Sequence, residues 1–366
     1  MKIECSKTKL HDAISKADKI TGKNATLPVL SCLVLEAKES NLIIRSTNLD
    51  LGIEMTIPVK VHQEGIVAVP SSLFVSYISN IPGEDMVNLE SVRGTLLITG
   101  NKNETQIKTL SSEDFPNIPK LESEKKFRIR SEDLVLGLKS VFYSASVSSM
   151  KPELSSVYLY PDESNVVFVA TDSFRLAEKK IKVEKADTFE PVLIPFKNVT
   201  EIIRVMDSLS DDVEVRFDND QIAFVIGGIY MISRIIDGNF PDYKQIIPKT
   251  NSSEVIVLKQ DLIQSLKLSN IFSDNFNQIS VKISPEDNIF EIRSKNVDKG
   301  ENRNTVSATL RGEGLEINFN HKYIVDAFPS ISSESITLYF SGLGKPMVIR
   351  GVGDNSFMYL VMPMNK

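Results

Sequence analysis

The segment NVVFVATDSFRLAEKKIKV, residues 165–183, contains the pattern around which the chain is organised. An apolar run over 166–170 reaches a polar turn at 171–173 (TDS), and a second extended segment follows over 175–183. Short segments of this kind on both sides of a polar turn are typical of a β-hairpin. The sequence therefore predicts two antiparallel strands that meet at this turn.

The same hairpin pattern occurs three times. Residues 41–59, NLIIRSTNLDLGIEMTIPV, match it at an offset of 124 positions, and residues 292–296, IRSKN, match IRSTN at 44–48 at twice that offset. The aligned pairs in the first two copies are Asn41 with Asn165, Thr47 with Thr171, Asn48 with Asp172, Glu54 with Glu178, Ile57 with Ile181 and Val59 with Val183. A pattern that recurs at one spacing indicates a triplicated fold unit.

Each repeat is predicted to contain two β-α-β-β-β halves. A short strand precedes an amphipathic helix in each first half, with Leu10, Leu134 and Leu262 at corresponding places on the helix. The predicted helices lie at residues 6–20, 71–80, 131–149, 197–210, 259–271 and 320–328. The expected class is thus α+β, with helices covering one face of antiparallel sheets.

Length and linkers indicate three domains. A chain of 366 residues is too long for one ordinary core. Polar, proline-containing joints over 115–120 and 240–249 separate the copies, as domain boundaries do. The predicted domains are residues 1–125, 126–250 and 251–366.

Composition is ordinary for a soluble globular protein, with 42% hydrophobic and 25% charged residues. The first residues, MKIECSKTKL, contain no apolar signal region, and no apolar run approaches the length of a membrane span. Only two cysteines are present, Cys5 and Cys32. A reducing cytoplasm is therefore the expected location, without membrane association.

The distribution of charge differs between the predicted helices and the rest of the chain. The formal net charge is −6, which argues against nucleic-acid binding by the whole surface. The six predicted helices carry ten Lys and Arg against eight Asp and Glu, so the remainder has a net charge of −8. Helices gathered on one side would attract phosphates weakly and without sequence preference. An ordinary solvated surface is the alternative that these counts leave open.

Residues that could carry catalysis do not converge. The three histidines, His11, His62 and His321, lack a cysteine or carboxylate at metal-ligand spacing, so neither a metal nor a cofactor is predicted. Asp172 and Arg175 could serve an enzyme with an active site between repeats, although a turn acid beside a strand-end cation is the simpler interpretation. A β-repeat adhesive protein is a third possibility, and it would predict a signal peptide or disulfides.

The C-terminal sequence YLVMPMNK, residues 359–366, is apolar for a chain end. It is consistent with a last core strand. It is also consistent with one wall of an exposed hydrophobic groove in which methionine gives adaptable contacts. Such a groove would suit a short peptide.

Several short motifs together resemble the bacterial DNA sliding clamps, the beta subunit of DNA polymerase III. These motifs are Thr26-Leu27-Pro28-Val29-Leu30, Ala170-Thr171-Asp172, Arg175-Leu176-Ala177, Asp237-Gly238, Phe240-Pro241-Asp242-Tyr243, Asn320 with Tyr323, and Val361-Met362-Pro363-Met364. The resemblance implies three tandem repeats of the DNA-clamp (processivity) fold in a ring-shaped homodimer around duplex DNA. It implies a non-catalytic accessory subunit that needs no cofactor.

The resemblance also implies a peptide groove between repeats two and three. The replicative polymerase, the clamp loader and repair polymerases would dock there through a short apolar motif. The residues carried over to this groove are Leu154, Thr171, Ser173, Phe174, Arg175, Leu176, Pro241, Ile246, Asn320, Tyr323, Leu360, Val361, Met362, Pro363 and Met364. The chain differs from the family pattern at Ser173-Phe174, where Gly-His is usual, and at Gln245, where Arg is common.

Two further sets of residues follow from the resemblance and from the helix positions. Sequence-independent contacts to DNA are expected from Lys23, Asn24, Lys139, Lys151, Lys197, Arg204 and Lys267. The dimer interface is expected to involve Ile107, Ile271, Phe272 and Phe276. Pro152 and Glu153 stand where aromatic residues are frequent in the family, so direct DNA contacts are expected to be weak.

Overall fold

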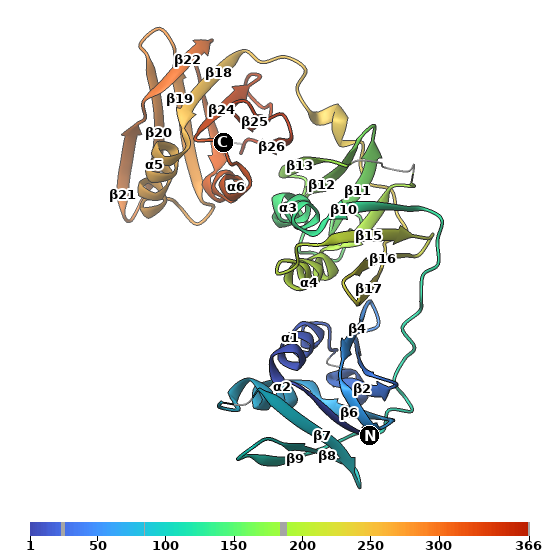
Figure 1. Ribbon diagram of the computed structural model, residues 1–366. Coiled ribbons are helices and arrows are strands. Elements are labelled where there is room, and N and C mark those ends of the chain that lie inside the picture. Colours follow the sequence, from blue (N-terminus) through green and yellow to red (C-terminus); the bar gives the residue numbers. More distant parts are fainter. Residues whose placement is uncertain (23–25, 84, 184–188, 365–366) are drawn as a thin grey trace. The chain divides into compact units, whose positions relative to one another are not determined.

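The computed structural model describes residues 1–22, 26–83, 85–183 and 189–364 (Figure 1). Its backbone contacts divide the chain into two compact units. Unit 1 contains Met1–Val135, Val183–Phe189 and Lys197–Ile235, and unit 2 contains Leu136–Lys182, Glu190–Phe196 and Ile236–Lys366. Each unit has its own antiparallel sheets and its own buried core.

The N-terminal segment has the β-α-β-β-β order twice, with one extra short strand before the second half. Its elements are β1 (Lys2–Ser6), α1 (Lys7–Asp18), β2 (Cys32–Lys38), β3 (Asn41–Thr47), β4 (Leu51–Pro58), β5 (Lys60–Gln63), β6 (Gly65–Pro70), α2 (Ser71–Asn80), β7 (Met86–Val92), β8 (Thr95–Thr99) and β9 (Glu104–Lys108). Helices α1 and α2 pack against each other, as Figure 1 shows. Pro70 stands directly before α2, where its missing N–H costs little.

The central segment repeats this order. Its elements are β10 (Lys126–Arg130), α3 (Ser131–Val141), β11 (Ser156–Asp162), β12 (Asn165–Thr171), β13 (Arg175–Lys182), β14 (Val192–Pro195), α4 (Phe196–Met206), β15 (Asp212–Phe217), β16 (Gln221–Ile226) and β17 (Ile229–Arg234). The predicted hairpin is confirmed, because β12 and β13 pair from Asn165 with Lys182 to Thr171 with Leu176.

The C-terminal segment completes the series. Its elements are β18 (Ser253–Leu258), α5 (Lys259–Ile271), β19 (Gln278–Ser284), β20 (Ile289–Asn296), β21 (Gly300–Thr305), β22 (Ala308–Gly312), β23 (Leu315–Asn320), α6 (His321–Ala327), β24 (Ser335–Phe340), β25 (Met347–Gly351) and β26 (Phe357–Val361). Short 3₁₀ turns occur as η1 (Pro28–Ser31), η2 (Phe142–Ser144), η3 (Tyr243–Ile246) and η4 (Phe328–Ser330).

Two large sheets continue from one predicted repeat into the next. In unit 1, β17 pairs with β4 in a sheet of order β10-β15-β16-β17-β4-β3-β2-β6. In unit 2, β13 pairs with β26 in a sheet of order β14-β11-β12-β13-β26-β25-β24-β18-β22. The backbone hydrogen bonds of these junctions join half of the central segment to each neighbour, which explains why the units do not coincide with three equal repeats.

Helix α3 is shorter than the predicted helix over 131–149. It ends at Val141, whose backbone has φ −125° and ψ −31°, and η2 follows directly. Within α3, Gly137 lies against the fully buried ring of Phe168 on β12, and a Cβ at this position would come within 2.5 Å of that ring. The close approach of helix and sheet therefore requires glycine here.

Replacing Gly137 with alanine is expected to destabilise the protein. Alanine has the higher helix propensity by about 1 kcal/mol, but the added methyl group would overlap the Phe168 ring. Overpacking of this kind costs about 1–3 kcal/mol, so we expect the free energy of unfolding to fall. Denaturant unfolding of G137A would measure the change. L136A, at an exposed position of the same helix, is the matched control and should change stability little.

Candidate functional site

The turn between β12 and β13 is held by its own side chains. The hydroxyl of Thr171 donates to the carbonyl oxygen of Arg175 at 2.6 Å and accepts from the amide of Ser173 at 3.2 Å. The carboxylate of Asp172 accepts from the amides of Phe174 and Arg175 at 2.9 and 3.0 Å. Ser173 has a positive φ of 78°. This network presents Phe174 at the tip of the turn with 60% of its surface exposed.

Arg175 joins this turn to helix α6. Its guanidinium donates from Nε to Asp172 at 3.0 Å and from Nη1 to Asp326 at 2.5 Å. The same group lies 4.7 Å from the centroid of the Tyr323 ring. Burial disfavours the charged form, but Tyr359 and the two aspartates outweigh it and raise the pKa of Arg175. Asp172 and Arg175 are thus saturated by structural contacts, which argues against the enzyme hypothesis built on them.

The pairing of β13 with β26 divides the predicted groove residues between two faces of one sheet. Arg175 pairs with Val361 and Leu176 pairs with Leu360. Successive strand residues point to opposite faces, so Val361 lies on the face of Arg175 and Leu360 on the face of Leu176. Leu176, Leu360 and Val361 are fully buried. They form the interior beneath the site and leave the exposed surface to their neighbours.

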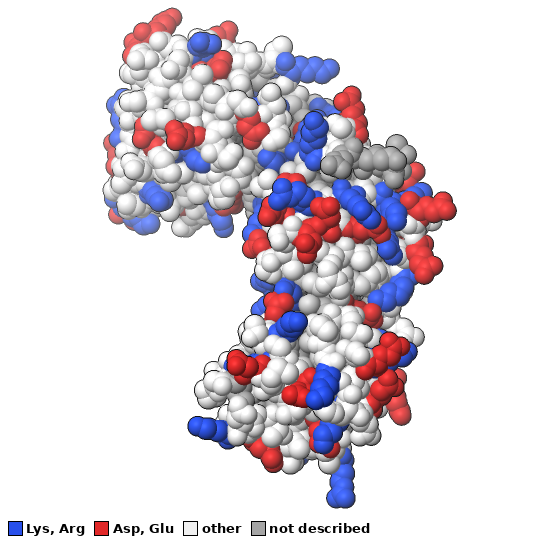
Figure 2. Space-filling view, in the orientation of Figure 1, with Lys and Arg blue, Asp and Glu red and all other residues white. Residues whose placement is uncertain are grey.

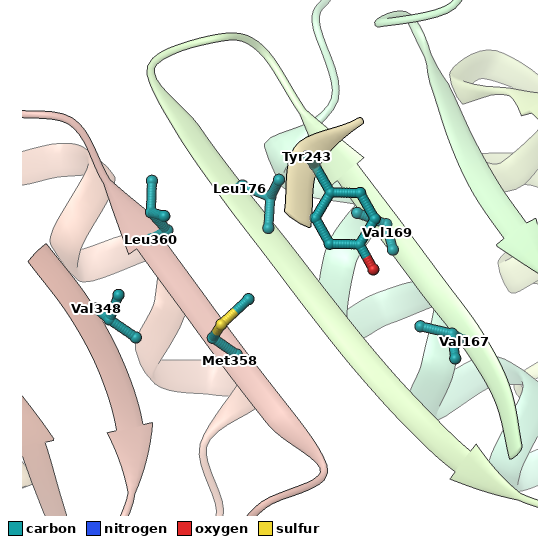
Figure 3. Packing of buried hydrophobic residues seen from close by; sticks show 7 residues of the cluster. All are labelled: Val167, Val169, Leu176, Tyr243, Val348, Met358 and Leu360. Carbon is teal, nitrogen blue, oxygen red and sulfur yellow. The ribbon is translucent and has the colours of Figure 1, made fainter. Parts of the chain in front are cut away.

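An apolar cluster covers the Leu176 face of this sheet, and we call it the outer cluster. Its buried members are Val167, Val169, Leu176, Tyr243, Val348, Met358 and Leu360. They belong to β12, β13, β25, β26 and η3, and Figure 3 shows how these side chains lie. Met362, Phe240 and Ile247 are partly buried and pack against it. The cluster offers an apolar base with partly exposed edges, which suits an apolar segment of another chain.

The linker after the central segment is fixed onto the outer cluster. The hydroxyl of Tyr243 in η3 donates to the carboxylate of Glu178 and lies 2.8 Å from the hydroxyl of Tyr160. Burial, then the contact with Glu178, raises the pKa of Tyr243. The rings of Phe240 and Tyr158 stack with centroids 4.7 Å apart. Pro241 and Ile246, which flank Tyr243, are left exposed as a wall beside the cluster.

Residues 362–364 form a second wall, in which Met362 packs against the outer cluster. The amide of Met362 donates to the carbonyl oxygen of Phe174 at 2.8 Å, and that of Met364 donates to Asn318 at 2.8 Å. Residues 362–364 are therefore tied to both the β12–β13 turn and β23 while their side chains remain partly exposed. The structure thus places Phe174 and Met362 beside the outer cluster.

The N-terminus of α6 lies beside this wall. The side chain of Asn320 caps the helix by accepting from the amide of Lys322 at 3.0 Å. The carbonyl oxygen of Tyr323 accepts from the hydroxyl of Tyr359 at 2.8 Å. Leu154, also predicted for the groove, is buried, and its carbonyl oxygen accepts from Ser146. These three residues position the surface more than they form it.

His321 makes the folding stability of the protein depend on pH. It is the first residue of α6, is 8% exposed, and has a pKa below the ordinary 6.5 because burial disfavours the cation. A depressed histidine pKa means that the unfolded chain takes up the proton first. The contribution of His321 to the free energy of unfolding is therefore fully present above about pH 6.5, and it is lost as the pH falls through the folded pKa.

We expect H321Q to flatten this dependence. Unfolding midpoints of wild type and variant, followed between about pH 7.5 and 5, should converge on acidification because only the wild type loses the histidine contribution. H62Q, at an exposed position of β5, is the comparison variant, and the assignment requires a larger change of slope in H321Q than in H62Q. A wild-type slope in H321Q would contradict the assignment.

The predicted DNA-contacting residues are surface side chains where the structure describes them. Lys139, Lys151, Lys197, Arg204 and Lys267 are all exposed. Arg204 forms a 2.7 Å ion pair with Glu201 one turn away on α4. The predicted contacts at 23–24 lie outside the described residues. On the face seen in Figure 2, basic and acidic side chains are interspersed, which fits weak electrostatic attraction better than a strongly basic binding surface.

The residues predicted for a dimer interface differ in accessibility. Ile107 is buried with 4% exposure, so its strand β9 offers a backbone edge and not this side chain. Ile271 and Phe276 expose 58% and 71% of their surfaces, and Phe272 is partly exposed. The backbone carbonyl of Phe276 accepts from Asn320 at 3.3 Å. Strand β9 is therefore an edge strand, and Ile271 and Phe276 are exposed apolar side chains.

Sequence reasoning missed several residues of the site. Tyr158, Tyr160, Tyr243, Val348 and Met358 belong to the outer cluster or pack against it. The available signals were the continuous apolar run over 357–361 and the tyrosines two positions apart in 158–160, because side chains two apart share a face of a strand. Glu178 was recognised only as a repeated position, and its partner Tyr243 is 65 residues away.

Among the residues that the structure describes, no group of three or more His, Cys, Asp or Glu is arranged to hold a metal ion.

No helix within the described ranges combines the length and apolar character needed to cross a membrane.

The fold defines a protein built from tandem repeats of β-α-β-β-β units. Three models of the DNA polymerase III beta subunit match it in tandem: the N-terminal domain over residues 1–119, the central domain over 128–242 and the C-terminal domain over 244–365. The chain therefore belongs to the DNA polymerase III beta subunit family, the bacterial sliding clamps.

Relatives support the assignment along the whole chain. A beta sliding clamp of Staphylococcus aureus is 26% identical, with 98% of this chain and 96% of the relative covered. A solved DNA polymerase III beta subunit from Thermotoga maritima has a TM-score of 0.95 and 26% identity, covering 100% of this chain and 99% of its own. A solved sliding clamp from Bacillus subtilis has a TM-score of 0.95 and 25% identity, and the match covers 100% of this chain and 99% of that structure's chain.

Membership of this family decides between the functional alternatives. Sliding clamps are accessory processivity factors of the replicative polymerase and not enzymes. An active site between repeats, considered from Asp172 and Arg175, is not supported. The expected α+β clamp fold is confirmed by the antiparallel sheets and by the likeness to solved clamps.

Proposed function

We propose that two copies of this chain form a head-to-tail ring around duplex DNA and tether the replicative polymerase to its template in the cytoplasm. Tethering raises the effective concentration of the polymerase at the primer end, so processivity requires no chemistry in the ring. The clamp loader and repair polymerases would use the same docking surface. The observation that carries the proposal is the outer cluster, with its walls at Pro241–Ile246 and Met362–Met364.

The open sheet edge supports the ring. Strand β9 is the last strand of the sheet β5-β1-β7-β8-β9, and an unpaired edge of this kind favours pairing with another chain. Ile271 and Phe276 are exposed, and in the proposed ring they form one apolar patch that the partner covers. A heterologous contact between β9 of one copy and this patch of the next closes a two-membered ring when the rotation is twofold.

A short apolar peptide would bind at the outer cluster by packing its side chains on a preformed apolar surface. Pro241, Ile246 and Met362 offer partly exposed apolar contacts, and Phe174 extends above them from a rigid turn. Phe174 is the residue through which this chain would differ most from relatives with Gly-His. We propose that it gives the surface a preference for aliphatic over aromatic client side chains.

Contact with DNA would be weak and independent of sequence. Lys139, Lys151, Lys197, Arg204 and Lys267 are exposed cations on helices or turns, and Lys23 and Asn24 complete the proposed set. Few phosphate contacts give a small dependence of binding on salt and permit sliding. We further propose domain boundaries at 1–125, 126–250 and 251–366, so that each protomer supplies three modules to the ring.

A topological experiment tests the ring. The protein is loaded with a compatible clamp loader and ATP onto nicked circular DNA, and half of the sample is then linearised. We expect retention on circles through a high-salt wash and loss from linear DNA, because a closed ring can leave only over an end. Equal, salt-sensitive loss from both DNAs would show ordinary electrostatic binding and overturn the proposal.

Variants of the proposed dimer interface test the ring independently. The double substitution I271D and F276D places two charges in the exposed patch, and we expect it to yield monomers in analytical ultracentrifugation and no retention on circles. L268D changes another exposed apolar residue of α5 and tests whether the patch extends along that helix. A dimer that persists in the double variant would sink the proposed interface.

A further inference from the structure

The junction of β4 with β17 in unit 1 has the same strand register and the same hydrogen bonds in its turn as the junction of β13 with β26. Thr47 and Asn48 hold their turn as Thr171 and Asp172 do, with the hydroxyl of Thr47 donating to Leu51 at 2.9 Å. Leu49 has φ 80° where Ser173 has 78°. The two turns, 124 positions apart, therefore have one backbone geometry.

The partner strands also correspond. Gly52 pairs with Ile232 as Leu176 pairs with Leu360. The amide of Arg234 donates to the carbonyl oxygen of Asp50 at 2.8 Å, just as that of Met362 donates to Phe174. Arg234 thus occupies the structural position of Met362, and Asp50 that of Phe174. The surface beside β17 is the counterpart of the proposed docking surface beside β26.

A pocket of about 310 Å³ lies at this counterpart position, and we call it the junction pocket. It is lined by Gly52, Ile232, Leu49 and Arg234, together with the linker over 116–119. Its volume falls at the lower end of the roughly 300–1,000 Å³ range of ligand sites. Gly52 has no side chain where the aligned Leu176 supplies one, and Ile118 covers this position: a Cβ at Gly52 would lie 3.3 Å from the Ile118 side chain.

The charge of the junction pocket differs from that of its counterpart. Arg234 is exposed, and within the described residues its guanidinium forms no ion pair or hydrogen bond. Arg175, by contrast, is saturated by two aspartates. Asp50 also lines the pocket, and among the described residues its carboxylate forms no ion pair with Arg234. An available guanidinium beside an apolar floor matches a peptide that carries a carboxylate next to an aliphatic side chain.

We propose that the junction pocket is a second peptide-docking site, which binds an extended segment with an aliphatic side chain on Ile232 and Ile118 and an acidic side chain at Arg234. The site would let one clamp hold two partners of different chemistry. It goes beyond the proposed ring and does not depend on it, because every residue involved belongs to unit 1.

Methyl NMR separates the two surfaces. The probes are the capped peptides acetyl-Ser-Leu-Asp-Leu-Ser-amide and its Asn counterpart, titrated into protein labelled at isoleucine δ1 methyls. Ile118 and Ile232 report on the junction pocket, and Ile246 reports on the β26 surface. We expect the Asp peptide to shift Ile118 and Ile232 saturably and to bind them roughly fivefold more tightly than the Asn peptide.

Two variants sharpen the test. R234M introduces the residue of the counterpart surface and should remove the preference for Asp while leaving the affinity for the Asn peptide unchanged. G52L adds a side chain that would displace Ile118 from its place over residue 52, and it should abolish the shifts at Ile232 for both peptides without altering those at Ile246. Equal affinity of the two peptides in the wild type, or shifts confined to Ile246, would overturn the second site while leaving the ring proposal intact.

Discussion

Removal of Met362–Lys366 should weaken client-peptide binding by roughly a hundredfold, which corresponds to ~2.8 kcal/mol. The truncation keeps β26, which ends at Val361, and so preserves its pairing with β13. It deletes the wall of the docking surface that Met362 and Met364 form through their hydrogen bonds to Phe174 and Asn318. The loss falls on binding because these side chains are partly exposed and contribute little to the core.

The measurement is fluorescence anisotropy with a labelled peptide from the clamp-contacting segment of the replicative polymerase of the same bacterium. A shorter truncation after Met364 retains the whole wall and should bind like the full chain. Analytical ultracentrifugation should give the same association state for all three proteins, because the proposed interface lies elsewhere. Unchanged peptide affinity after the longer truncation would refute the assignment of this surface.

Substitution of Arg175 by alanine should cost about 2–3 kcal/mol of local stability. The side chain is only 12% exposed and holds Asp172 and Asp326, so its removal leaves two carboxylates without their counter-ion. Breaking a fully buried pair costs about 3–5 kcal/mol, and the partial exposure of Asp326 reduces this figure. The stacking contact with Tyr323 is lost as well.

Hydrogen exchange of the α6 amides measures this cost directly, without assuming that the whole chain unfolds in one step. R175K should recover less than half of the loss, because an ammonium group cannot donate in the forked geometry that serves two acids. R204A removes an exposed arginine with a single carboxylate partner and should change stability by under about 1 kcal/mol. A similar small effect for R175A would contradict the bridging role.

The internal repetition made much of the fold predictable. All six helices lie within the predicted windows or start one residue outside them, because each begins where a short strand meets a polar or proline-containing step. The turn at 171–173 was also predictable, since Thr171 and Asp172 bond to amides only two to four residues away. Local hydrogen bonding of this kind is encoded in a few adjacent residues.

The composition of the site was less predictable because its contacts are long-range. Leu360 meets Leu176 only through the register of β26 against β13, and no local pattern specifies that register. The attachment of η3 by Tyr243 to Glu178 depends on the same sheet. Resemblance placed Val361 and Leu360 in one groove, whereas the pleat of the strand directs them to opposite faces.

The sheet that crosses from β17 to β4 also determines how the polypeptide could be divided. Five residue pairs, from Ile229 with Met55 to Ser233 with Leu51, hold the two sides together independently of the exposed linker over 122–125. Cleavage in that linker would cut the peptide chain but leave the hydrogen bonds between β4 and β17 in place. The apolar cluster of Leu121, Ala223, Tyr230 and Ile232 would also remain. The protein is therefore a natural candidate for expression as two complementing fragments, which gives a route to segmental isotope labelling of either part.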